Sequence, residues 1–132
     1  MSKWYWHIHH DVLLEESEDI EERINYIRND KPICEIKTRL RLLREVVGKL
    51  PPEFVKVARA YHEARRVCNT IRKAGAWTEY SPTAARAYKA LLKAGYLYDE
   101  ARREPNAEIT ALHAQECPGC PWDGETIFPK RS

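Results

Sequence analysis

The 132-residue sequence has no run of eighteen apolar residues, which argues against a membrane-spanning helix. Its first seven residues lack the basic segment and apolar core of a secretory signal. Its 22 basic and 20 acidic residues nearly cancel, so the net charge of +2 is by itself no argument for nucleic-acid binding. These absences predict a globular protein of the reducing cytoplasm, with a single domain over 1–132.

The sequence has four cysteines, which fall into two kinds. In a reducing compartment, thiols or metal ligands are expected in place of disulfides. Cys34 and Cys68 lie within helical patterns and are expected to be small buried side chains. Only Cys117 and Cys120 are close in sequence, which is too few for an iron–sulfur cluster. These two are the candidates for metal ligation.

Apolar residues recur at helical spacing through most of the chain, which predicts a mainly α protein. We expect helices over 18–31, 33–48, 52–75, 82–104 and 106–116, with Ser17 as the first N-cap and Pro82 in the first turn of the fourth helix. The expected fold is a helical bundle with a long antiparallel helical hairpin, a small two-stranded β element and a zinc knuckle that joins the termini.

The two central helices carry heptad-like stripes, in which apolar residues alternate at spacings of three and four. In the fourth helix the stripe is rich in alanine, which lets a neighbouring helix approach closely. Gly95 weakens a helix by about 1 kcal/mol relative to alanine. The stripe keeps its phase on both sides of this glycine, so we expect the helix to be continuous. The stripe comprises Ala84, Ala87, Leu91, Ala94, Tyr98 and Ala101.

The N-terminal segment alternates in a way that predicts a strand over 3–12. Trp4 and Trp6 would share one face of this strand, while His7 and His9 would share the other with Asp11. The C-terminal segment 117–128 ends in Gly124 to Phe128, which also has strand character. Pairing of these two segments would bring the chain termini together.

Cys117-Pro-Gly-Cys120 resembles the Cys-Pro-x-Cys knuckle of zinc ribbons and related small zinc modules. Two residues between cysteines allow both sulfurs to reach one tetrahedral zinc ion, and glycine permits the tight turn. A redox dithiol is the alternative, although that chemistry usually occurs where a strand leads into a helix. Here the pair follows a predicted helix, and two prolines flank it.

The remaining zinc ligands are predicted from helical and strand spacing. His113 lies four residues before Cys117, so both side chains share one side of a helix. His9 is the preferred fourth ligand, with His7 on the same strand face as the alternative. If both His7 and His9 bind, His113 would instead orient a ligand. The predicted metal site is thus Cys117, Cys120, His113 and His9, holding a structural Zn²⁺.

Three functions are compatible with this pattern. The favoured hypothesis is a protein-binding or assembly module, with a protein partner or self-association through the heptad helices. A zinc-dependent hydrolase is the second, with three protein ligands, a bound water and Asp11 or Glu116 as general base. The third is a nucleic-acid-binding protein that uses the basic helix 37–49, with Lys37, Arg41 and Arg44 at helical spacing.

Overall fold

The computed structural model describes residues 2–78 and 81–129, and it confirms a mainly α fold with a small antiparallel sheet. The contacts divide the chain into two compact units, formed by residues 1–49 with 107–132 and by residues 50–106. Among the described residues, none of the helices combines the length and apolar character needed to cross a membrane.

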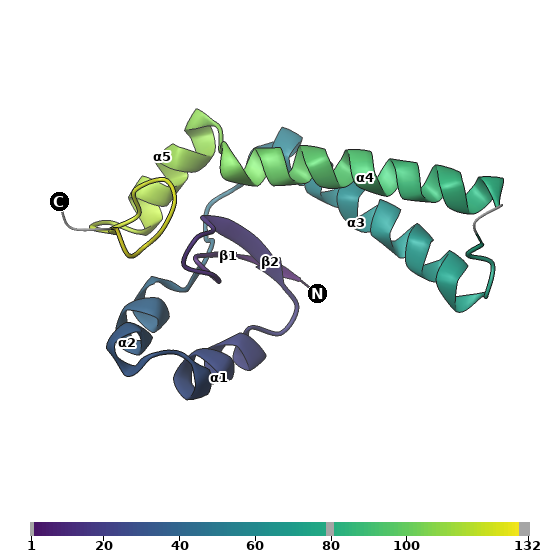
Figure 1. The fold of residues 1–132 in the computed structure, drawn as a ribbon. Coiled ribbons are helices and arrows are strands. Elements are labelled where there is room, and N and C mark those ends of the chain that lie inside the picture. The colour runs from purple at the N-terminus through teal and green to yellow at the C-terminus, as the bar shows by residue number, and fades with distance from the viewer. Residues whose placement is uncertain (1, 79–80, 130–132) are drawn as a thin grey trace. The chain divides into compact units, whose positions relative to one another are not determined.

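The second unit is the predicted antiparallel hairpin, formed by α3 (Pro52–Lys73) and α4 (Pro82–Arg103) (Figure 1). Ser81 caps α4 by accepting a hydrogen bond from the backbone N–H of Ala84 at 3.2 Å, and Pro82 occupies the first turn. α4 runs through Gly95 without a break, as its spacing predicted. Tyr98 lies buried in the hairpin, with its ring centroid 5.0 Å from that of Tyr61.

Gly95→Ala should stabilise the hairpin. A Cβ at this position would lie 3.5 Å from Tyr61 Cε1, an ordinary van der Waals contact, so alanine fits and restricts the unfolded chain. We expect the free energy of unfolding to rise by about 0.5–1 kcal/mol, measured by urea denaturation. Gly119→Ala is the matched control: Gly119 has φ +73°, so alanine there should destabilise the protein. If Gly95→Ala were less stable than the wild type, this would contradict the conclusion that there is room for a methyl group beside Tyr61.

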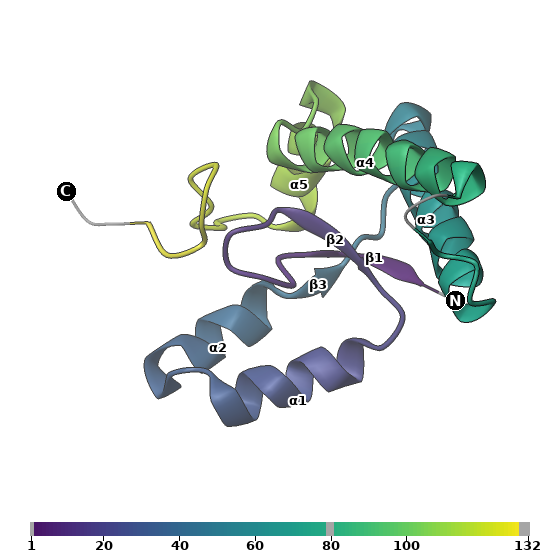
Figure 2. The same ribbon diagram turned by 45° about the vertical axis from the view of Figure 1, so that its right-hand side comes forward.

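The first unit is built on a three-stranded antiparallel sheet in the order β2-β1-β3 (Figure 2). The central strand β1 (Lys3–Trp6) pairs with β2 (Leu14–Ser17) and with the two-residue strand β3 (Arg44–Glu45). The helices of this unit are α1 (Ile20–Asp30), α2 (Ile33–Leu42) and α5 (Ala107–Glu116). Asp19, and not Ser17, caps α1 by accepting a hydrogen bond from Glu22 N–H.

Two predicted element boundaries in this unit are wrong. The strand expected over 3–12 ends at Trp6, because the backbone turns at His7, whose φ is +54°. The helix expected over 33–48 ends at Leu42. After Leu42, backbone N–H groups donate hydrogen bonds to β1 and to α5, and no longer to carbonyl groups of the preceding helical turn. Val46 N–H, for example, lies 2.8 Å from the Trp4 carbonyl oxygen.

The C-terminal segment 117–129 contains no strand, contrary to expectation. Asp123 Oδ1 accepts hydrogen bonds from the backbone N–H groups of Glu125 and Thr126, which closes a turn. One backbone bond nevertheless links this segment to the N-terminal loop, from Ile127 N–H to the His10 carbonyl oxygen at 2.8 Å. The loop after β1 and the C-terminal segment therefore meet, but without a β ladder.

The prediction for the other two cysteines is half right. Cys68 is buried in the hairpin at 1% exposure, whereas Cys34 is exposed in the first turn of α2.

The basic stripe predicted on helix 37–49 is also interrupted. Arg39 is buried and ion-paired with Glu35, and Arg44 lies beyond the end of the helix.

Candidate metal centre

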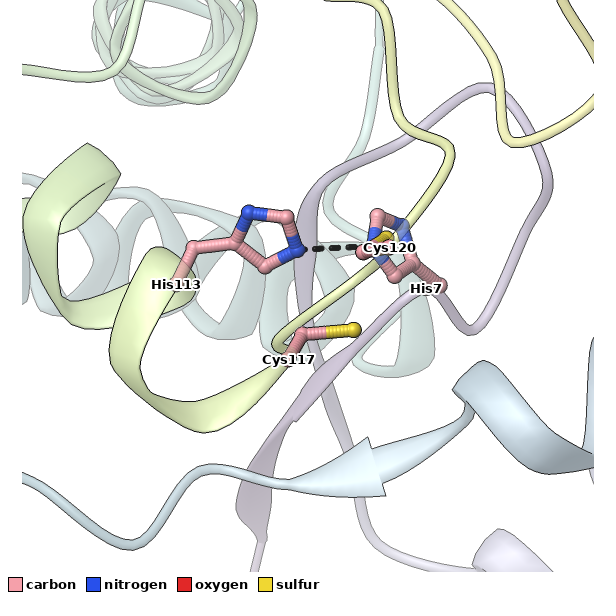
Figure 3. Close-up of side chains that lie close together, drawn as sticks. All are labelled: His7, His113, Cys117 and Cys120. Carbon is pink, nitrogen blue, oxygen red and sulfur yellow. Dashed lines mark hydrogen bonds between the residues drawn. The ribbon is translucent and has the colours of Figure 1, made fainter.

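Four side chains that ordinarily bind metal ions converge in the first unit. His7, His113, Cys117 and Cys120 each present one ligand atom, and these four atoms all lie within 4.8 Å of one another (Figure 3). The two Nε2 atoms of His7 and His113 are 3.0 Å apart, and Cys120 Sγ is 3.2 Å from His7 Nε2. His7 and Cys117 are buried, His113 is nearly so at 9% exposure, and Cys120 is half-buried. Two nitrogens and two sulfurs at such separations match the tetrahedral ligand set that zinc prefers.

α5 and the turn that follows it position three of these ligands. His113 and Cys117 are one helical turn apart, and Cys117 N–H donates to the His113 carbonyl oxygen at 2.8 Å. The chain then turns back, with Cys120 N–H 3.2 Å from the Cys117 carbonyl oxygen. Gly119 makes this turn possible because its φ of +73° is unfavourable for other residues. The predicted geometry of the knuckle is thus present.

His7 supplies the fourth ligand atom from the end of β1. Its backbone is in the left-handed region, which is uncommon for a residue with a side chain and often marks a functional position. The N–H of His7 donates to the Leu13 carbonyl oxygen at 3.0 Å, which closes the loop between β1 and β2. Its Nδ1 lies 3.3 Å from the Val12 carbonyl oxygen, which can only accept a hydrogen bond. The proton therefore belongs on Nδ1, and the Nε2 lone pair is directed at the cluster.

The structure does not bring His9, the preferred fourth ligand, to this site. His9 lies in the loop between β1 and β2, where its exposed side chain forms a 2.6 Å contact with Glu15 Oε1. Strand alternation had placed His7 and His9 on one face, but the turn at His7 ends the strand before His9. The structure thus brings together three of the four predicted ligands, and His7 replaces His9.

Burial keeps the two imidazoles neutral near pH 7. Desolvation, together with the neighbouring His113, lowers the pKa of His7 to about 4. Burial also lowers the pKa of His113. A neutral imidazole is the form that binds metal, so neither side chain must lose a proton before it can act as a ligand.

The thiol of Cys117 is in the opposite situation. Burial, with Cys120 beside it, raises the pKa of Cys117 to about 12, so without a cation this thiol keeps its proton. Redox dithiols depend on a lowered thiol pKa, which is absent at Cys117. A bound divalent cation would compensate the buried thiolate charge and displace the proton.

Glu116 organises the residues around the cluster, a role that the sequence patterns did not reveal. Its carboxylate accepts hydrogen bonds from Trp6 Nε1 at 3.1 Å and from the backbone N–H groups of Val47 and Gly48 at 2.8 and 2.6 Å. Burial alone would raise the pKa of Glu116, but these three donors lower it overall. The carboxylate therefore joins α5 to β1 and to the segment that follows β3.

Two tryptophans line the cluster. Trp6 is fully buried, and its ring centroid is 5.1 Å from that of His113. The Trp122 ring lies 5.2 Å from the His7 ring. Trp122 and Cys120 also pack against the buried side chains of Leu42, Cys117 and Ile127. The cluster is therefore embedded in an apolar shell, which strengthens electrostatic interactions within it.

Comparison of the chain with protein-family models, curated proteins and solved structures gives no match. The class of protein is therefore defined by its fold and its cluster: a mainly α protein in which a His₂Cys₂ group links the N- and C-terminal segments.

Proposed function

We propose that this protein is a zinc-stabilised binding module, in which a structural Zn²⁺ fixes the two chain ends and the helical hairpin carries the recognition surface. The observation that supports the zinc site is the convergence of four ligand atoms within 4.8 Å. They come from segments more than 100 residues apart in the sequence. A metal ion bound by both segments would contribute its binding free energy directly to folding.

The ligand count favours a structural ion over a catalytic one. Catalytic zinc sites have three protein ligands and an open position for water, whereas structural sites have four protein ligands. The two candidate general bases also fit poorly. Glu116 is engaged by three hydrogen-bond donors, and Asp11 is an exposed residue of the loop between β1 and β2. The hydrolase hypothesis therefore has no observation in its favour.

The hairpin supports the binding role because α4 exposes large apolar side chains. Tyr88, Leu92 and Tyr96 recur every four residues and are 47%, 55% and 69% exposed. The alanine stripe of α4, in contrast, includes the buried residues Ala84 and Ala87. Contiguous exposed apolar residues on an otherwise well-packed helix are typical of an interaction surface. A partner is therefore expected on the Tyr88–Tyr96 face.

The zinc site can be tested with a matched pair of histidine variants. Protein purified without added metal should contain one zinc per chain, measured by elemental analysis. His7→Asn should lose most of this zinc, because a three-ligand site binds more weakly, whereas His9→Asn should keep it. Wild-type protein without stoichiometric zinc, or equal losses in the two variants, would refute the proposed site.

A further inference from the structure

The near-zero net charge of the protein conceals a strong segregation of charge. Residues 64–98, the distal part of the hairpin, contain seven basic residues and one acidic residue, Glu79, which lies outside the described residues. The remaining chain therefore carries 15 basic and 19 acidic residues. The seven basic side chains are all exposed: Arg65, Arg66, Arg72, Lys73, Arg86, Lys89 and Lys93. Arg66 is ion-paired with Glu63, so most of the positive charge lies on the other six.

A groove runs between α3 and α4 on this basic part of the hairpin. It encloses about 500 Å³. Its α3 wall carries Arg65, Asn69 and Arg72, which are spaced four and three residues apart and so share one helix face. Its α4 wall carries Leu92 and Tyr96, and Asp99 lies at the end of the groove nearest the hairpin base. The α3 wall is therefore mainly cationic and polar, although it also carries Tyr61 and Cys68, and the α4 wall is apolar apart from Asp99.

A second cavity of about 240 Å³ extends this surface towards the hairpin tip. Arg72 lines both cavities, and Trp77 and Tyr88 line the second. The guanidinium carbon of Arg72 lies 4.8 Å from the Trp77 ring centroid, and the Trp77 and Tyr88 rings meet edge to face at 6.2 Å. The ring of Tyr88 is 47% exposed. Arg72 thus joins the groove that contains Arg65 and Tyr96 to the aromatic pair Trp77 and Tyr88.

We propose that this surface, the hairpin groove, binds single-stranded nucleic acid. The inference rests on the proposed role as a binding module and names its partner. A cationic wall that follows the phosphates beside aromatic rings on which bases stack is the general design of single-strand binding surfaces. Arg65 and Arg72 would contact phosphates, and Tyr88 and Tyr96 would stack on bases. In a duplex the bases stack on one another, so their faces are not available to these rings.

Charge complementarity favours this partner over a second copy of the chain that docks through its own hairpin groove. Another hairpin groove would bring the same positive charge to the contact and would be repelled. An acidic polypeptide would satisfy the cationic wall, but it would not in general supply flat rings for Tyr88 and Tyr96. A nucleic acid strand supplies both phosphates and bases at regular intervals.

The proposal can be tested by fluorescence anisotropy with the zinc-supplemented full chain and labelled 12-nucleotide single strands of oligo(U) RNA and oligo(dT) DNA. We expect binding of one or both strands at 50 mM salt. If about three phosphates are contacted, the affinity should fall roughly 20-fold between 50 and 200 mM salt. A duplex of the same length should bind more weakly. Absence of single-strand binding at 50 mM salt, or stronger binding of the duplex, would overturn the proposal.

Variants separate stacking from simple charge attraction. Tyr96→Ala should weaken binding by roughly tenfold at unchanged salt dependence, whereas Tyr96→Phe should bind like wild type. The single variants Arg65→Ala and Arg72→Ala should each weaken binding and flatten the salt dependence. Arg59→Ala, an exposed α3 residue that does not line the groove, is the charge-matched control and should bind like wild type. Circular dichroism melting checks that each variant is folded.

Two further outcomes would count against the proposal. Equal weakening by Arg59→Ala and by either groove arginine would indicate non-specific charge attraction. Competition by poly-glutamate as effective as that by unlabelled oligonucleotide would assign the groove to acidic polypeptides. The two proposals fail separately. Absence of stoichiometric zinc from the purified protein would refute the metal site, whereas absence of single-strand binding by zinc-loaded protein would overturn the assignment of the hairpin groove.

Discussion

Removal of zinc should strongly reduce hydrogen-exchange protection in β1, β2 and α5 while α3 and α4 keep theirs. The four ligand atoms belong to the unit formed by residues 1–49 and 107–132, and the hairpin contributes none of them. In zinc-finger peptides the ion contributes about 10–16 kcal/mol to folding. Here the unit also has an apolar core, so the loss should be smaller. We expect protection in these elements to fall at least about 100-fold, or about 2.7 kcal/mol.

Exchange should be followed by mass spectrometry on the intact chain, with and without a chelator. The double variant Cys117→Ser with Cys120→Ser provides the control, because it lacks both thiolate ligands and should resemble the chelated protein. The chelator should then change nothing further in that variant. A uniform loss of protection over both units, or no change in wild type, would contradict a structural ion held by these four residues.

The hairpin was predictable because its information is local. In α4, Ala84, Ala87 and Tyr98 recur at helical spacing, and all three are buried. Ser81 and Pro82 mark the start of the helix with residues whose side chains suit an N-terminus. The 3.6-residue period extends over the 22 residues of α4 and does not depend on the rest of the chain, so spacing alone predicts the helix and its buried face.

The sheet was not predictable in the same way because its pairing is non-local. β3 consists of Arg44 and Glu45, neither of which favours a strand, and it forms only because β1 is beside it. Val46 and Val47 are β-branched and precede Gly48, which was a local sign that the helix ends early. Apolar spacing outweighed that sign in the prediction, yet Val47 is 88% exposed.

The candidate metal site shows the same division between local and distant information. Cys117, Cys120 and His113 lie within eight residues, and one helical turn and one tight turn bring them together. The fourth position depends on the loop that joins β1 to β2. Strand alternation places His7 and His9 on the same face, so it does not distinguish them as ligands. Only the positive φ of His7, which ends the strand, distinguishes them. No sequence pattern marks a histidine for that conformation, so His7 remained an alternative.

Trp6→Ala should be the most destabilising single substitution outside the four ligands. Trp6 is fully buried, contacts the His113 ring and donates from Nε1 to Glu116 Oε1 at 3.1 Å. Truncation of a buried tryptophan costs about 3–5 kcal/mol, because the variant buries less apolar surface on folding and also leaves a cavity. Trp6→Phe keeps most of the apolar contact but removes the donor. Its cost should be smaller, about 1.5–3 kcal/mol for a hydrogen bond to a charged group.

These costs should be measured by urea denaturation followed by far-ultraviolet circular dichroism, at one fixed zinc concentration, because a bound ion shifts the apparent stability. Tyr96→Ala is the control, since this aromatic side chain is 69% exposed and its loss should change stability by less than about 0.5 kcal/mol.

The order of the two costs, Trp6→Ala above Trp6→Phe, matters more than their absolute values. Alanine at position 6 removes both the core contact and the donor to Glu116, and phenylalanine removes only the donor. Equal costs for the two variants would mean that the hydrogen bond to Glu116, and not packing, makes Trp6 important. A cost below about 1 kcal/mol for Trp6→Ala would contradict the full burial of its side chain.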